Sequence, residues 1–401
     1  MPVAARSTVQ DQAPISFEAL PKLGPPGSIA KRETVKALDT EILTLSNGVR
    51  VLLGRSSSEA GRVYVQVRFG SGLAGLPADR MTPAWAAPAL GATGIGDLSQ
   101  DAIDRMTSGR QISLNFGIAE DAFLIKGITR PADLADQLRI MATKLAMPGW
   151  DAGPVLRTRA AAVLTLKTAN SSPAEVLNRN LGALLRPGDA RWKAPSPADA
   201  ESLTPEAFRA FWEPVLRTAP IELSVFGDFN REAALSAILQ SFGALPARAD
   251  GKASSSTPLP AFTPNQLPVQ LTHKGDADQA IAVLVWPTGG GTAGARTAHQ
   301  LDILAAIFSD RLFEQFREGD GASYSPDVTS LWPIGFPTGG TLTVSAQVKP
   351  ETLPGFFARA RFIAADLAQN PVSVDELRRA IAKLESLLPA PEVPDLFALR
   401  D

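Results

Sequence analysis

The chain has 401 residues, of which 45% are hydrophobic, so it is long and apolar enough to bury a core in each of two domains. Its 39 Lys and Arg residues nearly balance its 41 Asp and Glu residues, and this balance argues against a nucleic-acid partner. The chain contains no cysteine, which excludes disulfide bonds, thiolate metal sites and a cysteine nucleophile.

The N-terminal segment has no features of a targeting signal. It lacks the apolar core of a signal peptide, and no later run approaches the roughly 18 apolar residues of a membrane span. We therefore expect no signal peptide and no membrane span in this chain. Residues 1–37 mix Pro, Gly, Ala and charged residues without a period, which predicts an extended lead-in or linker.

Residues 38–247 are predicted to form a first α+β domain. Asn47-Gly48 lies between two apolar runs in EILTLSNGVRVLLG, and this dipeptide is the strongest short signal for a hairpin. Thr204-Pro205 predicts a helix start, because Thr caps the helix and Pro lacks an N–H that would have no partner there. Further strands are expected at 62–72, 112–130 (as an antiparallel pair) and 221–229, and helices at 83–90, 99–108, 131–147 and 230–242.

A Ser- and Pro-rich linker at 248–267 precedes a second domain at 268–401, in which the same order of elements begins again. Its strands are expected at 269–274, 280–286, 323–331 and 340–348, and its helices at 295–316 and from 350 and 374. Nothing after these helices matches the strand IELSVFGDF that closes the first copy. The sequence therefore predicts an α+β fold of two tandem homologous domains, with antiparallel-rich sheets packed against helices, and a truncated second domain.

These segments resemble the pitrilysin/insulinase family of zinc metallopeptidases. The resemblance rests on LSNGVRVLL, VQVRFGSGLAG, ISLNFGIAEDAFLIKG, SVFGDF and DRLFEQFREGDGASYSP, and it extends over roughly residues 38 to 388. It is strongest to the carboxy-terminal, non-catalytic half of bacterial single-chain members. It implies the insulinase-like fold of two α+β domains per half, two halves that close around a peptide substrate, and a periplasmic location.

The family's catalytic motif is missing at its own position. Members that cut peptides carry His-x-x-Glu-His, in which two imidazoles bind zinc and the Glu takes a proton from the zinc-bound water. Here Pro83, Ala86 and Ala87 stand at the positions of the His, the Glu and the second His, and none of them can bind a metal. The chain has only two histidines, His273 and His299. We expect no catalytic residue and no metal in this chain, and we expect the zinc in a partner half.

Arg311 and Tyr324 are the candidate substrate-binding residues. Without the resemblance, an exposed helix charge and a strand aromatic are their simplest interpretation. In the family, the corresponding Arg and Tyr hydrogen-bond the substrate near the cut bond, and Arg and Tyr side chains both suit this role as donors. His273 and His299 are expected to be satisfied structural residues rather than ligands.

Two functions of different classes remain open on the sequence. The first is the non-catalytic half of a zinc endopeptidase, which forms one wall of the substrate chamber, contacts the peptide and pairs with a catalytic metallopeptidase half or subunit. The second is a peptide-binding or scaffold protein that kept the fold without any proteolytic role. The strand expected at 111–118 is relevant to both functions, because an edge strand there could pair with an extended peptide or could be covered by another part of the protein.

Overall fold

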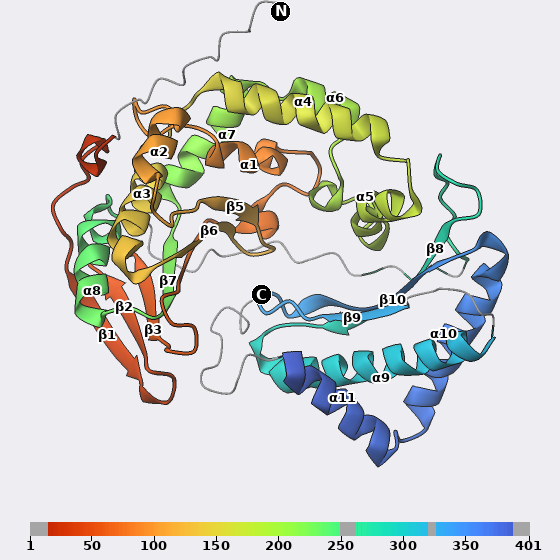
Figure 1. The fold of residues 1–401 in the computed structure, drawn as a ribbon. Coiled ribbons are helices and arrows are strands. Elements are labelled where there is room, and N and C mark those ends of the chain that lie inside the picture. The colour runs from red at the N-terminus through yellow and green to blue at the C-terminus, as the bar shows by residue number, and fades with distance from the viewer. Residues whose placement is uncertain (1–14, 249–261, 263, 266, 320–325, 388–401) are drawn as a thin grey trace, which may run out of the picture.

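The computed structural model describes residues 15–248, 262, 264–265, 267–319 and 326–387. Within them the chain builds two sheets, each packed against its own helices (Figure 1). No helix in these ranges combines the length and apolarity that a bilayer-spanning helix requires.

The first domain contains a seven-stranded sheet in the order β1-β2-β3-β7-β4-β6-β5. Its neighbouring strands are antiparallel except for the parallel pair β3 and β7. The strands are β1 (Ile29–Val35), β2 (Thr40–Leu45), β3 (Arg50–Arg55), β4 (Val63–Phe69), β5 (Asn115–Ile118), β6 (Phe123–Thr129) and β7 (Ile221–Gly227). The predicted hairpin at Asn47-Gly48 is confirmed, and Gly48 has the positive φ of 86° that this turn requires.

Helices cover the first sheet, except for α5, which lies against the second sheet (Figure 1). The α-helices are α1 (Pro88–Gly91), α2 (Gln100–Thr107), α3 (Leu134–Ala146), α4 (Ala152–Thr168), α5 (Pro173–Leu185), α6 (Pro197–Ser202), α7 (Pro205–Thr218) and α8 (Arg231–Gln240). The short 3-10 turns η3 (Gly72–Gly75) and η4 (Pro83–Ala86) lie between β4 and α1, and η6 (Ala190–Trp192) lies between α5 and α6. The predicted cap of α7 is confirmed, because the Thr204 side chain accepts a hydrogen bond from the backbone N–H of Ala207.

The second domain contains a three-stranded antiparallel sheet in the order β8-β10-β9. Its elements are β8 (Ala280–Gly289), α9 (Ala295–Gly319), β9 (Asp327–Leu331), β10 (Thr338–Val348), α10 (Leu353–Gln369) and α11 (Val374–Leu387). This order repeats β4, β5, β6 and α3 of the first domain, with β8 in the place of β4. The first copy adds β7 beside β4, whereas the described part of the second copy has no strand at that edge of β8.

Two expectations are wrong. Residues 29–35, expected in a linker, form the edge strand β1, which pairs with β2. Its sequence IAKRETV is exposed on both faces, so it has no apolar alternation to reveal it. Residues 269–274, expected as a strand, join no sheet: Val269 and Leu271 are 55% and 43% exposed, and the backbone N–H of Lys274 donates to the Asn170 carbonyl of the first domain at 2.6 Å.

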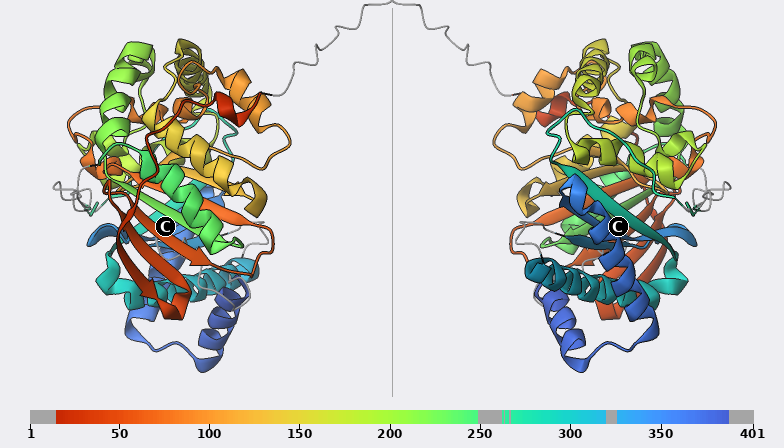
Figure 2. Two further views of the ribbon diagram at one scale, coloured as in Figure 1. Left: turned by 90° about the vertical axis from the view of Figure 1, so that its left-hand side faces the viewer. Right: turned by 90° about the vertical axis from the view of Figure 1, so that its right-hand side faces the viewer.

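The second sheet lies between its own helices and the first domain. In Figure 1, α9 to α11 cover one face of β8, β9 and β10, and the other face turns toward the first domain. The side views in Figure 2 agree, with the C-terminal helices at the bottom of the molecule. Contacts hold the domains together: the Arg186 guanidinium donates to the Gly339 carbonyl at 3.2 Å, and Phe336 packs on Ala74 and Trp192.

Candidate functional site

Two of the three positions of the missing zinc motif, Ala86 and Ala87, are packed into the first domain's core. Pro83 and Ala86 lie in η4, and Ala87 follows it. Ala86 and Ala87 are 0% and 1% exposed and belong to the main hydrophobic cluster, so their methyl groups contact apolar side chains. Among the residues that the structure describes, no group of three His, Cys, Asp or Glu side chains is placed to hold a metal.

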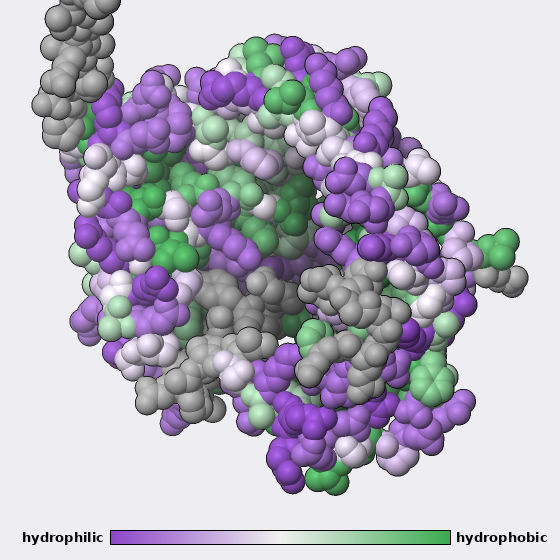
Figure 3. All heavy atoms as spheres, turned by 45° about the vertical axis from the view of Figure 1, so that its right-hand side comes forward, coloured by the Kyte–Doolittle hydropathy of each residue, from purple (hydrophilic) through white to green (hydrophobic). Residues whose placement is uncertain are grey.

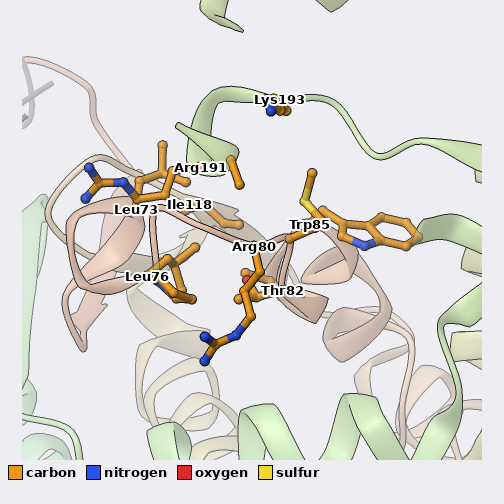
Figure 4. Close-up of a pocket in the computed structure, with 12 residues that line it drawn as sticks. Leu73, Leu76, Arg80, Thr82, Trp85, Ile118, Arg191 and Lys193 are labelled. Carbon is orange, nitrogen blue, oxygen red and sulfur yellow. The ribbon is translucent and has the colours of Figure 1, made fainter. Parts of the chain in front are cut away.

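A small pocket lies directly beside these positions. It encloses about 60 Å³, and its walls come from η3 and the loop after it, η4, the end of β5, and η6. Figure 4 shows Leu76, Arg80, Thr82, Trp85 and Ile118 around it, with Lys193 on the segment across from them. Sites for small organic ligands usually enclose about 300 to 1,000 Å³. The pocket therefore has room for one small side chain.

The charges around the pocket have one sign. Three of its lining residues are cationic and none is acidic; the cations are Arg80, Arg191 and Lys193. Arg191 is neutralised behind the wall by Asp189, whose carboxylate accepts hydrogen bonds of 2.9 and 2.7 Å from the guanidinium. Burial would raise the pKa of Asp189, but the Arg191 hydrogen bonds outweigh it and lower that pKa.

Arg191 also positions one wall of the pocket. Its guanidinium donates to the Ala74 carbonyl at 3.3 Å, and the Ala190 N–H donates to the Ala78 carbonyl at 2.7 Å. These bonds tie η6 to η3 and to the loop that leads into η4. The sequence pattern revealed none of these groups, because isolated loop cations have no period and become neighbours only in the folded chain.

The sequence left undecided whether the strand expected at 111–118 lies at an edge of its sheet, and in the structure β5 does. It pairs with β6, and no described strand lies on its other side. α1 packs against β5, and a Cβ atom at Gly91 would lie 3.3 Å from the Leu114 carbonyl oxygen and 3.5 Å from the Phe116 ring. Figure 3 shows the surface hollowed between the two domains, with hydrophobic residues at the back of the hollow.

Arg311 lies within the helical layer of the second domain. Its Nη1 is 2.6 Å from an Asp366 carboxylate oxygen on α10, and its Nε is 2.7 Å from Glu376 on α11. Hydrogen bonds from Arg311 and then from Ser373 lower the pKa of Glu376 to about 2. Tyr324 lies outside the described residues. The convergence of Arg311 and Tyr324 on a substrate therefore stays a prediction.

The two histidines lie far from the pocket in the chain. His273 Nδ1 accepts a hydrogen bond from the Gly275 N–H at 3.1 Å, so its Nε2 donates to the Gln279 carbonyl at 2.8 Å. Both of its ring nitrogens serve a turn before β8. His299 lies on α9 with its side chain 76% exposed, and Asp302 is 3.9 Å away. These contacts fit the structural role that was expected for both residues.

Residues 202–384 match the family model described as the Peptidase M16 inactive domain. This segment is therefore similar to the inactive domains of M16 peptidases. The predicted resemblance to the non-catalytic half of an insulinase-family peptidase is confirmed, and so is the predicted fold class. No curated protein gives a significant sequence match to the chain.

Solved structures support the same assignment at the level of the fold. The periplasmic protease PqqL from Escherichia coli is 17% identical with a TM-score of 0.77, over 96% of this chain and 42% of that one. A Pseudomonas fluorescens M16 inactive domain is 17% identical with a TM-score of 0.67, over 87% of this chain and 84% of that one. Pitrilysin is 15% identical with a TM-score of 0.62, over 96% of this chain and 41% of that one. The chain thus spans about two fifths of PqqL and of pitrilysin.

Proposed function

We propose that this chain is the non-catalytic half of a zinc endopeptidase. It forms one wall of a chamber and contacts the peptide, while a partner half or subunit with His-x-x-Glu-His supplies the zinc and the general base. The M16 inactive-domain match carries this proposal. The core-packed Ala86 and Ala87 support it, because alanine methyl groups can neither bind zinc nor accept a proton.

The inner surface of the chain suits the wall of a chamber. Figure 1 shows β5, the terminal strand of the first sheet, turned toward the face of the β8-β10-β9 sheet that its own helices leave uncovered. An open strand edge offers backbone donors and acceptors to any extended peptide, whatever its side chains. We also propose a periplasmic location, since PqqL, which has the same fold, is described as a periplasmic protease.

The test uses metal content and peptide cleavage. The purified chain, dialysed and analysed for metal, should hold no stoichiometric zinc and should leave a quenched fluorescent peptide intact. Adding the protein half that contains His-x-x-Glu-His should give peptide cleavage that a chelator abolishes. The rate of this cleavage should exceed that of the catalytic half alone. One tightly bound zinc per chain, or a catalytic half that gains nothing from this chain, would overturn the proposal.

The alternative is a scaffold or peptide-binding protein without a proteolytic role. One observation favours it: Arg311, the candidate substrate donor, uses its guanidinium in ion pairs within the second domain. A scaffold would form a stable complex with its partner and leave the partner's peptidase rate unchanged. Size-exclusion chromatography of the mixture, combined with the cleavage assay, separates the two functions.

A further inference from the structure

The turn between β5 and β6 lies against the second domain. A Cβ atom at Gly335, in the turn between β9 and β10, would lie 2.6 Å from Asp121 Oδ2. In the same turn of the second domain, Phe336 packs on Ala74 of η3. The Ala74 N–H in turn donates to the Glu120 carbonyl at 2.8 Å. The β5–β6 turn therefore belongs to the contact between the two domains.

Arg186 crosses this domain contact. It follows α5 in the first domain, is 5% exposed, and donates from Nη2 to the Gly339 carbonyl of the second domain at 3.2 Å. Its guanidinium carbon lies 3.6 Å from the centre of the Trp192 ring and 5.0 Å from the centre of the Phe262 ring. Its Nε–H is buried and has no acceptor among the described residues. Arg186 thus uses one donor across the contact and keeps another without a partner.

The Glu120 carboxylate lies near Arg186 without being bonded to it. The opposite charges of the two side chains interact, yet neither a hydrogen bond nor an ion pair joins Glu120 to any described residue. Its neighbour Asp121 is already paired, because its carboxylate lies 2.6 Å from Arg68 Nη2. The domain contact therefore holds an ion pair, Glu120 with Arg186, that could form and has not formed.

The other charged groups around Glu120 are paired with one another. η3 and the second-domain turn at 332–339 contain no ionisable side chain. Two ion pairs lie on the neighbouring elements of the first domain: Asp189 with Arg191 on η6, and Asp121 with Arg68 on β4. Arg186 is therefore the cation that responds to the charge of Glu120.

The closed domain contact favours the neutral form of Glu120. Burial raises the pKa of Glu120 above its ordinary value of 4.5, the Arg186 guanidinium opposes this rise, and the Asp121 carboxylate adds to it. Opening the contact returns the carboxylate to water, so the closed contact holds the proton more tightly than the open one. The advantage of the closed contact is therefore complete below about pH 4.5, and it is lost as pH rises through the raised pKa.

We propose that Glu120 and Arg186 form a proton-operated latch between the two domains. While Glu120 is neutral, Arg186 stays on the Gly339 carbonyl and holds the domains together. Once Glu120 is ionised, its two oxygens offer the guanidinium a bidentate ion pair that a single carbonyl cannot match, and Arg186 leaves Gly339. The width of the hollow between the domains (Figure 3) then depends on pH.

The test measures the distance between the domains as a function of pH. Because the chain has no cysteine, two introduced cysteines can carry spin labels at chosen positions. Thr165→Cys on α4 and Gln369→Cys on α10 replace exposed residues, one in each domain. Double electron–electron resonance from about pH 4.5 to about pH 8 should show one short distance at the acid end and a longer distance whose share grows with pH. Because one proton is released, the ratio of long to short should rise by at most about tenfold per pH unit.

Variants of the labelled chain identify the groups that carry the response. Glu120→Gln keeps the shape of the side chain but cannot ionise, so it should show the short distance at every pH. Arg186→Met should show the longer distance even at about pH 4.5. The matched control Glu232→Gln, which alters an exposed acid on α8, should keep the pH response of the parent.

Three results would overturn the latch. They are a parent distance that does not change with pH, a pH response that survives in Glu120→Gln, and an Arg186→Met chain that stays short at acid pH. Far-ultraviolet circular dichroism at each pH checks that every variant is folded. These measurements need no catalytic half, so the latch stands or falls independently of the proposed function.

Discussion

Replacing Arg311 by Met separates a structural role from a substrate-binding role. The Met side chain retains an apolar stem but removes the hydrogen bonds to Asp366 and Glu376. Glu376 also closes a capping box at the start of α11, where its carboxylate accepts from the Ser373 N–H at 2.9 Å and the Ser373 hydroxyl accepts from the Glu376 N–H at 3.2 Å. Arg311 thus fixes the first turn of α11 on α9.

The size of the effect follows from the pKa of Glu376. A fall from the ordinary value of 4.5 to about 2 corresponds to at most about 3 kcal/mol of stability by proton linkage. The side chains of Arg311 and Glu376 are 20% and 21% exposed, so solvent screens the pair, and we expect about 1 to 2 kcal/mol. Because 1.4 kcal/mol is a factor of ten, amide exchange over 374–387 should accelerate about tenfold in Arg311→Met.

The assay is native-state hydrogen exchange on the full chain, read by mass spectrometry. The matched control is Arg378→Met on α11 itself, since Arg378 is 74% exposed and 3.9 Å from Asp375, and it should change exchange by less than about twofold. If Arg311→Met also changed exchange by less than twofold, the structural role would be wrong. A loss of partner-supported cleavage without faster exchange would instead assign Arg311 to the substrate.

Three further predictions concern other parts of the chain. The pKa of Glu376 is depressed, so the contribution of its carboxylate to stability is complete above about pH 4.5 and is lost as pH falls toward 2. Amide hydrogen exchange over 374–387 should show this loss of stability in the parent chain and not in Glu376→Gln. Burial lowers the pKa of Lys144 from 10.5 to about 7. Between these two pH values the unfolded chain binds more protons than the folded chain, so the contribution of Lys144 to the free energy of unfolding rises with pH. Urea titrations of the parent and of Lys144→Met should therefore give unfolding free energies whose difference grows over that range. Arg186→Met removes the bond to Gly339 and the cation stacked 3.6 Å from the Trp192 ring centre, so the radius of gyration from X-ray scattering should increase, and an unchanged radius would contradict the proposed role in holding the domains together.

Local chemistry made several elements predictable. Asn47-Gly48 marks a hairpin, in which Gly48 adopts the positive φ, and Thr204-Pro205 marks a helix start that the structure reproduces with a side-chain cap. The absence of zinc ligands at Pro83, Ala86 and Ala87 could also be seen from the residue types alone, because a side chain without a donor atom cannot bind zinc in any fold. The resemblance to the family and the missing motif could therefore both be noted before any coordinates.

Other features depend on contacts that residue patterns do not encode. β1 carries charges on both faces and becomes a strand only because β2 supplies its hydrogen bonds, whereas Val269 and Leu271 alternate as a strand would but have no sheet to join. Arg80 and Lys193 lie more than a hundred residues apart and meet at one pocket because η6 is bonded to the loop before η4. The sequence by itself determined the fold and the loss of the zinc ligands, since both follow from short-range patterns. Only the tertiary structure decided which edge is open, which cations are free and what Arg311 contacts, since these depend on which distant segments pack together.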